Sequence, residues 1–477
     1  MKPFDPPALM AALPELMLAG LGMMLLLFAV SGKQENYRMT AWLGVLALIA
    51  VATVVFQCPF GKTVSFNGMF ITDEFSSYMK VLVLAGSAVA LMMSAKYMER
   101  EKINRVEYPV LMLFSVLGMM LMISANDLMS LYMGLELQSL PLYVLASLSR
   151  NNLRSTEAGL KYFILGALSS GMLLYGMSLV YGFTGATGFA QIAAAGSSPG
   201  MITGMVLILA GLAFKLAAAP FHMWAPDVYE GAPTAVTAFF AIAPKVAAIA
   251  LITRVLMGPF GDMTEMWRQV IIVISAASMA LGAVAAIVQT NIKRLLAYSS
   301  IGHMGYALIG LAAANQAGIQ GVLLYMTFYM AMSIGVFCIV LMMKKKEVMV
   351  ENISALAGLA KQQPGLALAM SIMMFSMAGI PPLAGFFGKL FIFQSAVAAG
   401  LYTLAVFGVL TSVVAAYYYL RIIKVMYFDE AESAIDKAED RGLNLILLAA
   451  ALAVTFFIVW PAPLINGAAT AAQALIK

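Results

Sequence analysis

Four ionisable side chains lie inside long apolar stretches of this sequence: Glu136, Lys215, Lys245 and Lys389. The chain is 62% hydrophobic and only 11% charged, so most of its other charged residues fall in short polar segments. A charged side chain at the centre of a bilayer costs about 2.5–3.5 kcal/mol on insertion scales, and such residues usually mark an ion or proton path. One acid and three lysines in these positions predict proton translocation.

The residue types suggest how a proton could be held and released. Desolvation disfavours the charged form of a buried lysine, whereas a neighbouring carboxylate favours it. If Glu136 lies close to Lys215, it keeps that lysine charged, and its withdrawal or neutralisation promotes release of the proton. Lys245 can then accept the proton, and Lys389 can pass it towards an exit. We therefore predict a two-state electrostatic switch.

Three further residues are candidates for the same path. Histidine titrates near neutral pH and can relay protons. His222 follows Pro220 within an apolar stretch, and His303 lies within another, while Lys161 is near the start of a third. We expect all three on the proton path. The two histidines are too distant in sequence to suggest a metal site.

These residues must be positioned by helices that cross a membrane. A spanning helix needs about 20 apolar residues, and the apolar runs give about fourteen such spans. The fold class is therefore all-α integral membrane. A β-barrel would show alternating segments of about ten residues instead of continuous apolar runs. The predicted spans are 8–30, 39–57, 74–95, 109–124, 126–148, 158–183, 202–229, 233–257, 267–290, 292–314, 317–343, 364–399, 401–427 and 441–465.

Two of the spans, 202–229 and 364–399, are too long for one straight crossing, and each contains proline. Pro220 and Pro381 remove a backbone donor, so both helices should break there. The two prolines align in a weak internal repeat with a spacing of about 160, which predicts two inverted five-helix repeats, each with a broken helix. The predicted units are 1–108 (three helices), 109–257 and 258–427 (the repeats) and 428–477 (a last helix).

The basic residues predict the orientation. Most of the 28 lysines and arginines lie in loops that follow odd-numbered spans, whereas the loops after even-numbered spans hold Lys62 and Arg268, with Arg254 at a helix end. Positively charged loops stay in the cytoplasm, so an even number of spans places both termini in the periplasm. This bias also accounts for the net charge of +5 without a nucleic-acid partner.

The sequence excludes several kinds of chemistry in this chain. Cys58 and Cys338 are the two cysteines, and they lie far apart, with no spacing typical of zinc or iron–sulfur ligands. No Rossmann or P-loop fingerprint is present. Redox chemistry and nucleotide hydrolysis, if they drive this protein, must take place in another chain, and no cofactor or metal is expected here.

Two long motifs carry a resemblance to a known family. Residues 214–233, FKLAAAPFHMWAPDVYEGAP, and residues 293–305, KRLLAYSSIGHMG, resemble the signatures of the antiporter-like subunits of respiratory complex I. The resemblance covers the whole chain. It implies fourteen helices with two inverted five-helix bundles, and it places Glu136, Lys215, Lys245 and Lys389 on the family's central hydrophilic axis. The related subunit M generally has glutamate where this chain has Lys389, and subunit L carries additional helices and a long lateral arm, so a third type of antiporter-like subunit is favoured.

The resemblance also implies partners. NADH, FMN, iron–sulfur clusters and quinone are expected in other subunits, to which this chain couples proton pumping. Its expected neighbours are another antiporter-like subunit, small membrane subunits, the lateral helix of subunit L and lipids. The expected location is a bacterial inner membrane.

Three other functions are compatible with parts of the pattern. A subunit of a multi-subunit sodium–proton antiporter shares these motifs, and the sequence separates it poorly from the first interpretation. A scaffold without transport would need paired, expendable buried charges. A solute carrier with inverted repeats would need a more polar substrate cavity.

Overall fold

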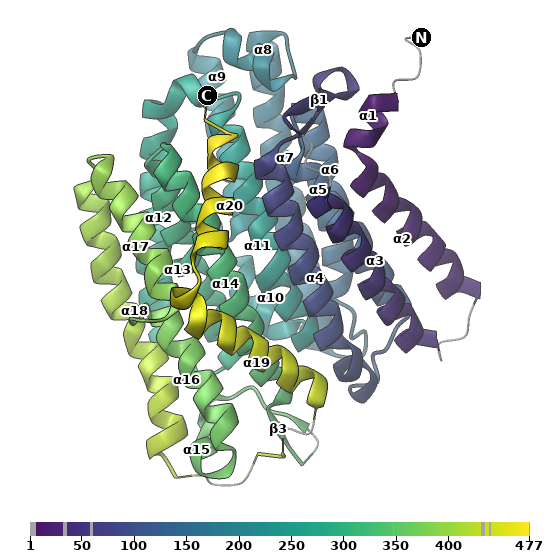
Figure 1. Cartoon of the computed structure of the whole chain (residues 1–477), viewed down its shortest axis with the longest axis vertical. Helices are drawn as coiled ribbons and strands as arrows, with labels where there is room; N and C mark the ends of the chain where they lie inside the picture. Colours follow the sequence, from purple (N-terminus) through teal and green to yellow (C-terminus); the bar gives the residue numbers. More distant parts are fainter. Residues whose placement is uncertain are drawn as a thin grey trace.

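The structure, a computed structural model, describes residues 6–31, 36–57, 61–346, 348–430, 435–437 and 440–476. Cys58 and the first five residues lie outside this part of the chain. The described residues are almost entirely helical (Figure 1), and eleven of their helices are long and apolar enough to cross a membrane. Helix α6 (Leu128–Ala146) and three shorter apolar helices, α5 (Glu107–Ile123), α16 (Pro364–Ala378) and α17 (Ala384–Ala398), complete the crossings. The predicted all-α membrane fold is confirmed.

The first three crossings form one side of the bundle (Figure 1). They are α2 (Leu13–Ser31), preceded by the short α1 (Pro6–Ala11), α3 (Tyr37–Gln57) and α4 (Glu74–Arg100). Helix α4 begins with a capping box in which the Asp73 carboxylate accepts from the Ser76 N–H and the Ser76 hydroxyl accepts from the Asp73 N–H. This reciprocal cap satisfies two donors that would otherwise lack partners.

The next five crossings contain the first broken helix. They are α5 (Glu107–Ile123), α6 (Leu128–Ala146), α7 (Leu153–Thr184), the pair α9 (Pro199–Leu216) and α10 (Trp224–Gly231), and α11 (Thr234–Met257), with the short α8 (Phe189–Ala194) between α7 and α9. Helix α9 ends because Ala217 takes a left-handed conformation with φ 55°. Pro220 follows, and the helix resumes only at Trp224, so the predicted break is present.

Five further crossings follow, and each runs in the direction opposite to that of its counterpart in the first five. They are α12 (Thr264–Ile287), α13 (Ile292–Ala312), α14 (Gln316–Met342), the pair α16 (Pro364–Ala378) and α17 (Ala384–Ala398), and α18 (Tyr402–Phe428), with the short α15 (Leu359–Gln362) before α16. Helix α16 ends at Gly379, whose φ is 90°, and Pro381 and Pro382 separate it from α17. Both expected helix breaks therefore lie at proline sites that follow a left-handed residue.

The last crossing differs from the expected single helix at 441–465. Helix α19 (Arg441–Phe456) is followed by a 3-10 turn, and α20 (Ala462–Gln473) starts after Pro461. In Figure 1 α19 runs obliquely across the bundle, whereas α20 turns upward and ends near the same end as the N-terminus. Pro461 and Pro463 explain the change of direction, because neither has an N–H to continue the helix.

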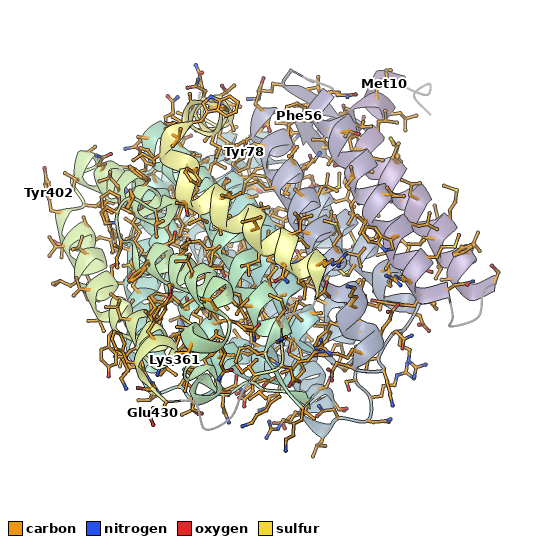
Figure 2. The ribbon with its side chains drawn as sticks, turned by 60° about the horizontal axis from the view of Figure 1, so that its bottom comes forward. Met10, Phe56, Tyr78, Lys361, Tyr402 and Glu430 are labelled. Carbon is orange, nitrogen blue, oxygen red and sulfur yellow. The ribbon has the colours of Figure 1, made fainter. Side chains whose placement is uncertain are left out.

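Short antiparallel hairpins lie at the two ends of the bundle. Strands β1 (Thr63–Ser65) and β2 (Phe70–Thr72) pair at the end that carries the termini, and β3 (Lys344–Lys345) and β4 (Val348–Met349) pair at the opposite end. The second hairpin belongs to the lysine- and arginine-rich end, here called the basic end, which comes forward in Figure 2 near Lys361.

Burial separates central from outer helices. All of the most apolar stretch of α11 is buried, as is 94% of that of α13, compared with 33% for α2 and 39% for α7. Large apolar side chains such as Phe56 and Tyr402 project from the outer helices, as lipid contact requires (Figure 2). Lys245 of α11 and His303 of α13 are therefore at the centre, out of reach of lipid.

Glycines allow two helix pairs to approach closely at equivalent places. A Cβ added at Gly282 of α12 would lie 2.6 Å from the backbone nitrogen of Gly302 in α13. Gly118 of α5 faces the backbone of Gln138 in α6 with even less room. Small residues commonly bring membrane helices into backbone contact in this way.

A buried ion pair joins the start of α4 to the end of α11. The Arg254 guanidinium donates to both carboxylate oxygens of Asp73, at 3.0 and 2.8 Å, and to the carbonyl of Ile123 at 2.9 Å. Burial alone raises the pKa of Asp73, but the charge and hydrogen bonds of Arg254 outweigh it and hold that pKa below its usual value. The carboxylate is therefore ionised at neutral pH.

We expect Asp73→Asn to destabilise the protein by about 3–5 kcal/mol, because it leaves the Arg254 guanidinium buried without a counter-charge. The measurement is the unfolding temperature of the assembled complex in detergent, detected as the temperature at which this chain is lost from the complex. Asp262→Asn changes an exposed aspartate near the same end and is the control. An unfolding temperature equal to that of the control would contradict a structural role for the pair.

Candidate functional site

Lys215 lies at the break in the first discontinuous helix. It is the penultimate residue of α9, and only 8% of it is exposed. Its Nζ donates to the Ser139 hydroxyl at 2.8 Å and to the Tyr143 hydroxyl at 3.2 Å. Both hydroxyls belong to α6, so the ammonium is held by neutral oxygens of a neighbouring helix.

Glu136 lies on the same face of α6 as these two hydroxyls. The spacing of Glu136, Ser139 and Tyr143 is three and four residues, which brings them together on one side of a helix. The carboxylate is half-buried, its Oε1 has no hydrogen-bond partner, and no ion pair joins it to Lys215. Lys215 therefore donates its hydrogen bonds to the Ser139 and Tyr143 hydroxyls of α6 and forms no ion pair with Glu136 of the same helix.

Lys245 lies inside α11 and is almost completely buried, with 1% exposed. Its Nζ donates to the carbonyl of Leu216 at 2.6 Å and lies 5.5 Å from the centre of the Trp224 ring. Leu216 is the last residue of α9. The C-terminal end of a helix carries a partial negative charge, so Lys245 occupies a position that favours a cation.

Lys389 repeats this arrangement in the second broken helix. Its Nζ donates to the carbonyls of Met377 and Ala378, at 3.0 and 2.9 Å, and to the Ser412 hydroxyl at 2.8 Å. The two carbonyls are the last of α16. A lysine therefore caps the interrupted end of each first half-helix.

His303 is buried between the two lysines' helices, on α13. Tyr325 contacts its Nδ1 at 2.6 Å, and Tyr419 contacts its Nε2 at 3.0 Å. Tyr419 also exchanges a hydrogen bond of 2.5 Å with Ser299. His303 and Lys389 line one small cavity, which has no room for a water molecule.

Two predicted site residues lie apart from this axis. His222 is half-buried in the turn between α9 and α10, and its Nδ1 has no hydrogen-bond partner among the described residues. Lys161 is 41% exposed and forms ion pairs with Glu157 at 2.7 Å and Asp227 at 2.8 Å. Arg294 also pairs with Asp227, at 2.7 Å. The structure thus places Lys161 in a charged network at the basic end.

Neutral hydroxyl groups that contact the ionisable residues were not among the predicted site residues. They are Ser139, Tyr143, Tyr325, Ser412 and Tyr419. Tyrosines are also frequent on the lipid-facing surface, as Tyr175 shows with 62% exposed. Residue type alone therefore gives no signal, whereas spacing along α6 from Glu136 could have indicated Ser139 and Tyr143.

Buried lysines occur elsewhere with a different kind of partner. Lys80, 1% exposed, has its Nζ 2.6 Å from the Glu15 carboxylate, and Lys293, 2% exposed, pairs with Glu351 at 2.8 Å. Lys215, Lys245 and Lys389 have no carboxylate within ion-pair distance among the described residues. No group of three or more metal-ligating side chains was found in that part of the chain.

Comparison with known proteins gives one consistent family. The family described as NADH:quinone oxidoreductase/Mrp antiporter, TM, matches residues 125–415. The chain is 56% identical over 471 residues to NADH-quinone oxidoreductase subunit N of Rhodospirillum rubrum, covering 97% of each chain. It is 53% identical over 476 residues to the subunit N of Paramagnetospirillum magneticum, covering 98% of each.

Solved structures agree with these relatives. A chain of respiratory complex I from Thermus thermophilus has a TM-score of 0.83 and 31% identity, and the match covers 96% of this chain and 99% of that one. A chain of the Mrp complex from Dietzia sp. also has a TM-score of 0.83, with 98% and 100% covered, but only 22% identity. That second likeness shows a shared fold alone.

Proposed function

The chain belongs to the NADH-quinone oxidoreductase subunit N family, and from this premise we propose that protons move through it along the buried axis of lysines and histidine. It is an antiporter-like, proton-translocating membrane subunit of that translocase. Subunit N is an antiporter-like subunit other than subunits L and M, as expected from the lysine at position 389. The axis consists of Glu136, Lys215, Lys245, His303 and Lys389.

The observation that carries the proposal is the kind of partner each axis lysine has. Lys215, Lys245 and Lys389 donate only to hydroxyl and carbonyl oxygens among the described residues. A lysine held in this way can release its proton without leaving an unpaired carboxylate in an apolar interior, which would be costly. When the amine is protonated again, the same oxygens accept hydrogen bonds from the ammonium. Such a residue can be loaded and unloaded.

Glu136 supplies the negative charge whose distance from Lys215 changes in each cycle. Its approach to Lys215 stabilises the ammonium, and its withdrawal favours transfer of a proton from Lys215 Nζ towards Lys245. In the separated state the ammonium of Lys215 is held by the hydroxyls of Ser139 and Tyr143. From Lys245 the proton reaches Lys389 past His303, which contacts tyrosine hydroxyls through both ring nitrogens.

His222 and Lys161 act at the margins of the axis. His222 lies in the break beside Lys215, and its unpartnered Nδ1 is free to exchange a proton with water that enters the turn. Lys161 holds α10 against α7 through Asp227 and is a candidate relay from the basic end.

We also propose an orientation and a set of partners. We place the basic end in the cytoplasm and both termini in the periplasm of a bacterial inner membrane. The proposed units remain 1–108, 109–257, 258–427 and 428–477. NADH, FMN, iron–sulfur clusters and quinone belong to partner subunits. Neighbours in the membrane are another antiporter-like subunit, small membrane subunits and the lateral helix of subunit L.

The sodium–proton antiporter reading has weaker support. The Mrp chain shares the fold at 22% identity, whereas whole-chain relatives above 50% identity are named as subunit N. Sequence identity over the full length therefore favours the complex I subunit.

We expect Lys215→Ala to reduce NADH-driven quinone reduction and proton pumping together, by roughly two orders of magnitude if Lys215 is an obligatory proton carrier. Both rates are measured in inside-out membrane vesicles containing the assembled complex. Lys361→Ala, at an exposed lysine of the basic end, is the control and should keep both rates. Normal rates in an assembled Lys215→Ala complex would sink the proposal.

A second prediction concerns the hydroxyl beside Lys215. Tyr143→Phe keeps the ring but removes the 3.2 Å hydrogen bond. We expect pumping to slow by about tenfold to a hundredfold, since one hydrogen bond to a charged group contributes about 1.5–3 kcal/mol. Tyr175→Phe, on the exposed face of α7, is the matched control. Equal pumping rates in the two variants would show that Tyr143 has no part in the transfer.

A further inference from the structure

A polar cavity opens at the basic end, beside the end of the first broken helix. We call it the vestibule. Its volume is about 300 Å³, enough for about ten water molecules at roughly 30 Å³ each. Segments of α4, α7, α10, α13 and the strand β4 surround it, including Ser149, Arg154, Glu230, Lys293 and Glu351. It lies outside the lysine axis and has no role in the function proposed above.

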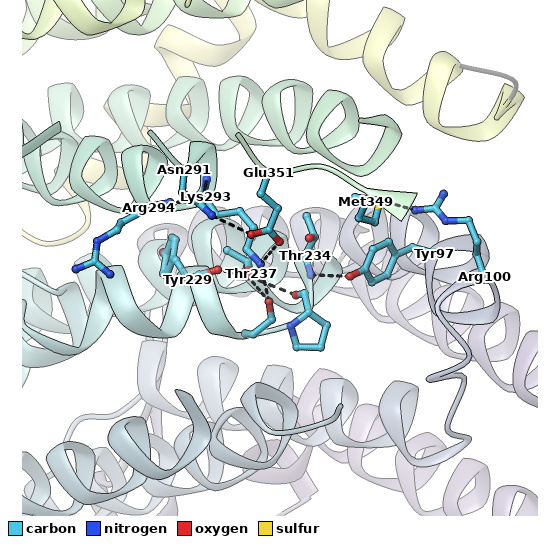
Figure 3. Close-up of polar contacts among 12 residues, drawn as sticks. Tyr97, Arg100, Tyr229, Thr234, Thr237, Asn291, Lys293, Arg294, Met349 and Glu351 are labelled. Carbon is cyan, nitrogen blue, oxygen red and sulfur yellow. Dashed lines mark hydrogen bonds and ion pairs between the residues drawn. The ribbon is translucent and has the colours of Figure 1, made fainter. Parts of the chain in front are cut away.

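The inner wall of the vestibule carries a buried lysine. Lys293 is the second residue of α13, and its Nζ donates to the carbonyl of Ala232, directly after α10, at 2.8 Å. It also pairs with Glu351 at 2.8 Å (Figure 3). Only 2% of the Lys293 side chain is exposed, whereas 26% of the Glu351 side chain is. The carboxylate thus meets water and the amine faces the interior.

Glu351 belongs to the segment after β4 and not to a membrane helix. Its second carboxylate oxygen accepts from the Asn291 amide at 3.0 Å. On the other side of the vestibule, Arg100 donates to the sulfur of Met349, and the Tyr97 hydroxyl accepts from the Thr234 N–H at 3.0 Å (Figure 3). Polar contacts with α4 and α13 thereby fix the position of the carboxylate at the rim.

Polar groups continue inward from Lys293 along α13. Ser300 is seven residues further, about 10 Å along the axis and on the same face of the helix. Its hydroxyl accepts from Tyr329 at 2.9 Å, and His303 follows one turn deeper, with its ring 5.2 Å from that of Tyr329. Tyr229, on α10, is fully buried, and its hydroxyl lies near the Ser300 hydroxyl.

From this geometry we propose that the vestibule is a proton inlet to the axis, with Glu351 as the acceptor and Lys293 as the first inward donor. The inference rests on the proposed proton path and its orientation. A proton from vestibule water adds to the Glu351 carboxylate, which weakens the ion pair. Lys293 passes one of its protons inward, through water that enters beside Ser300 and Tyr329, to a ring nitrogen of the neutral His303, and the neutral amine of Lys293 then takes the proton from Glu351. One proton has entered, and both groups have regained their charges.

Other charged groups face the same pair. Glu230 on α10 and Glu101 after α4 favour a proton in the vestibule, while Arg154 on α7 opposes it. A purely structural pair would instead hold the β4 segment against the end of α10, and it would have no need of an adjoining cavity for water. Filling the cavity without breaking the ion pair should stop pumping if the vestibule is an inlet, and should have no effect if the pair is only structural.

The first test changes the acceptor. In assembled complexes, Glu351→Gln keeps the shape and hydrogen-bonding capacity but cannot be charged, and we expect pumping per vesicle to fall by roughly an order of magnitude or more. Glu351→Asp retains the carboxylate and should restore at least half of the parental rate. A Glu351→Gln complex that pumps at the parental rate would overturn the inlet.

The second test leaves the ion pair intact. Ser149→Cys places a thiol at the vestibule wall, and a membrane-impermeant sulfonatoethyl thiosulfonate is added to inside-out vesicles, whose outer face is the cytoplasmic one. We expect the modified complex to lose most of its pumping, and reduction of the mixed disulfide to restore it. Lys361→Cys, exposed at the same end, and the parent complex are the controls and should be unaffected.

The outcomes separate the inlet from the axis. If filling the vestibule has no effect while Lys215→Ala abolishes pumping, protons enter elsewhere and the inlet is wrong. If both changes leave pumping intact, the axis itself fails. Loss of pumping in both, with recovery on reduction of the disulfide, supports the two proposals together.

Discussion

The carbonyl groups freed where α9 and α16 end inside the bundle are the feature on which the rest of the site depends. Unsatisfied carbonyls cost several kcal/mol each in an apolar interior, so they need donors. Buried lysines have the converse need for acceptors. Lys245 at Leu216 and Lys389 at Met377 and Ala378 meet both needs at once. Neither the helix break nor the lysine would be tolerable there alone.

The kind of partner divides the buried cations into two groups. Arg254, Lys80 and Lys293 each have a carboxylate, and a charge in such a pair is expensive to remove because its partner is left behind. Two of these pairs, those of Arg254 and Lys80, join separate helices and suit a structural role. The pair of Lys293 differs because its carboxylate meets water.

The three axis lysines form the second group, held by neutral oxygens. Their partners keep a hydrogen bond available whether or not the amine is charged. The charge on Lys215, Lys245 or Lys389 can therefore change without disrupting packing. This distinction accounts for the presence of both fixed and exchangeable charges in one apolar bundle.

Much of this could be predicted from the sequence because bilayer thickness and proline act locally. Long apolar runs indicated the crossings, and Pro220 and Pro381 indicated both breaks. The bend at Pro461 was missed, since an apolar run does not reveal a change of direction. The hydroxyl partners of Lys215 were also beyond the sequence, because a spacing along the chain says nothing about how two helices are rotated towards each other. The burial of Lys293 was beyond it too, because that burial depends on packing by α10 and the β4 segment.

The same contacts explain how a change at one helix end could reach several groups. Leu216, whose carbonyl accepts from Lys245, directly follows Lys215 in α9. A small displacement of that helix end would therefore lengthen the Lys245 hydrogen bond and move Lys215 relative to Ser139 and Tyr143 in the same step. When Lys245 loses its proton, the Leu216 carbonyl retains a weaker donor, and water must enter to satisfy it. Protonation, hydration and the position of the helix break are thus linked through one carbonyl group. A proton carrier requires such a link if its path is to open only when the carrier is protonated.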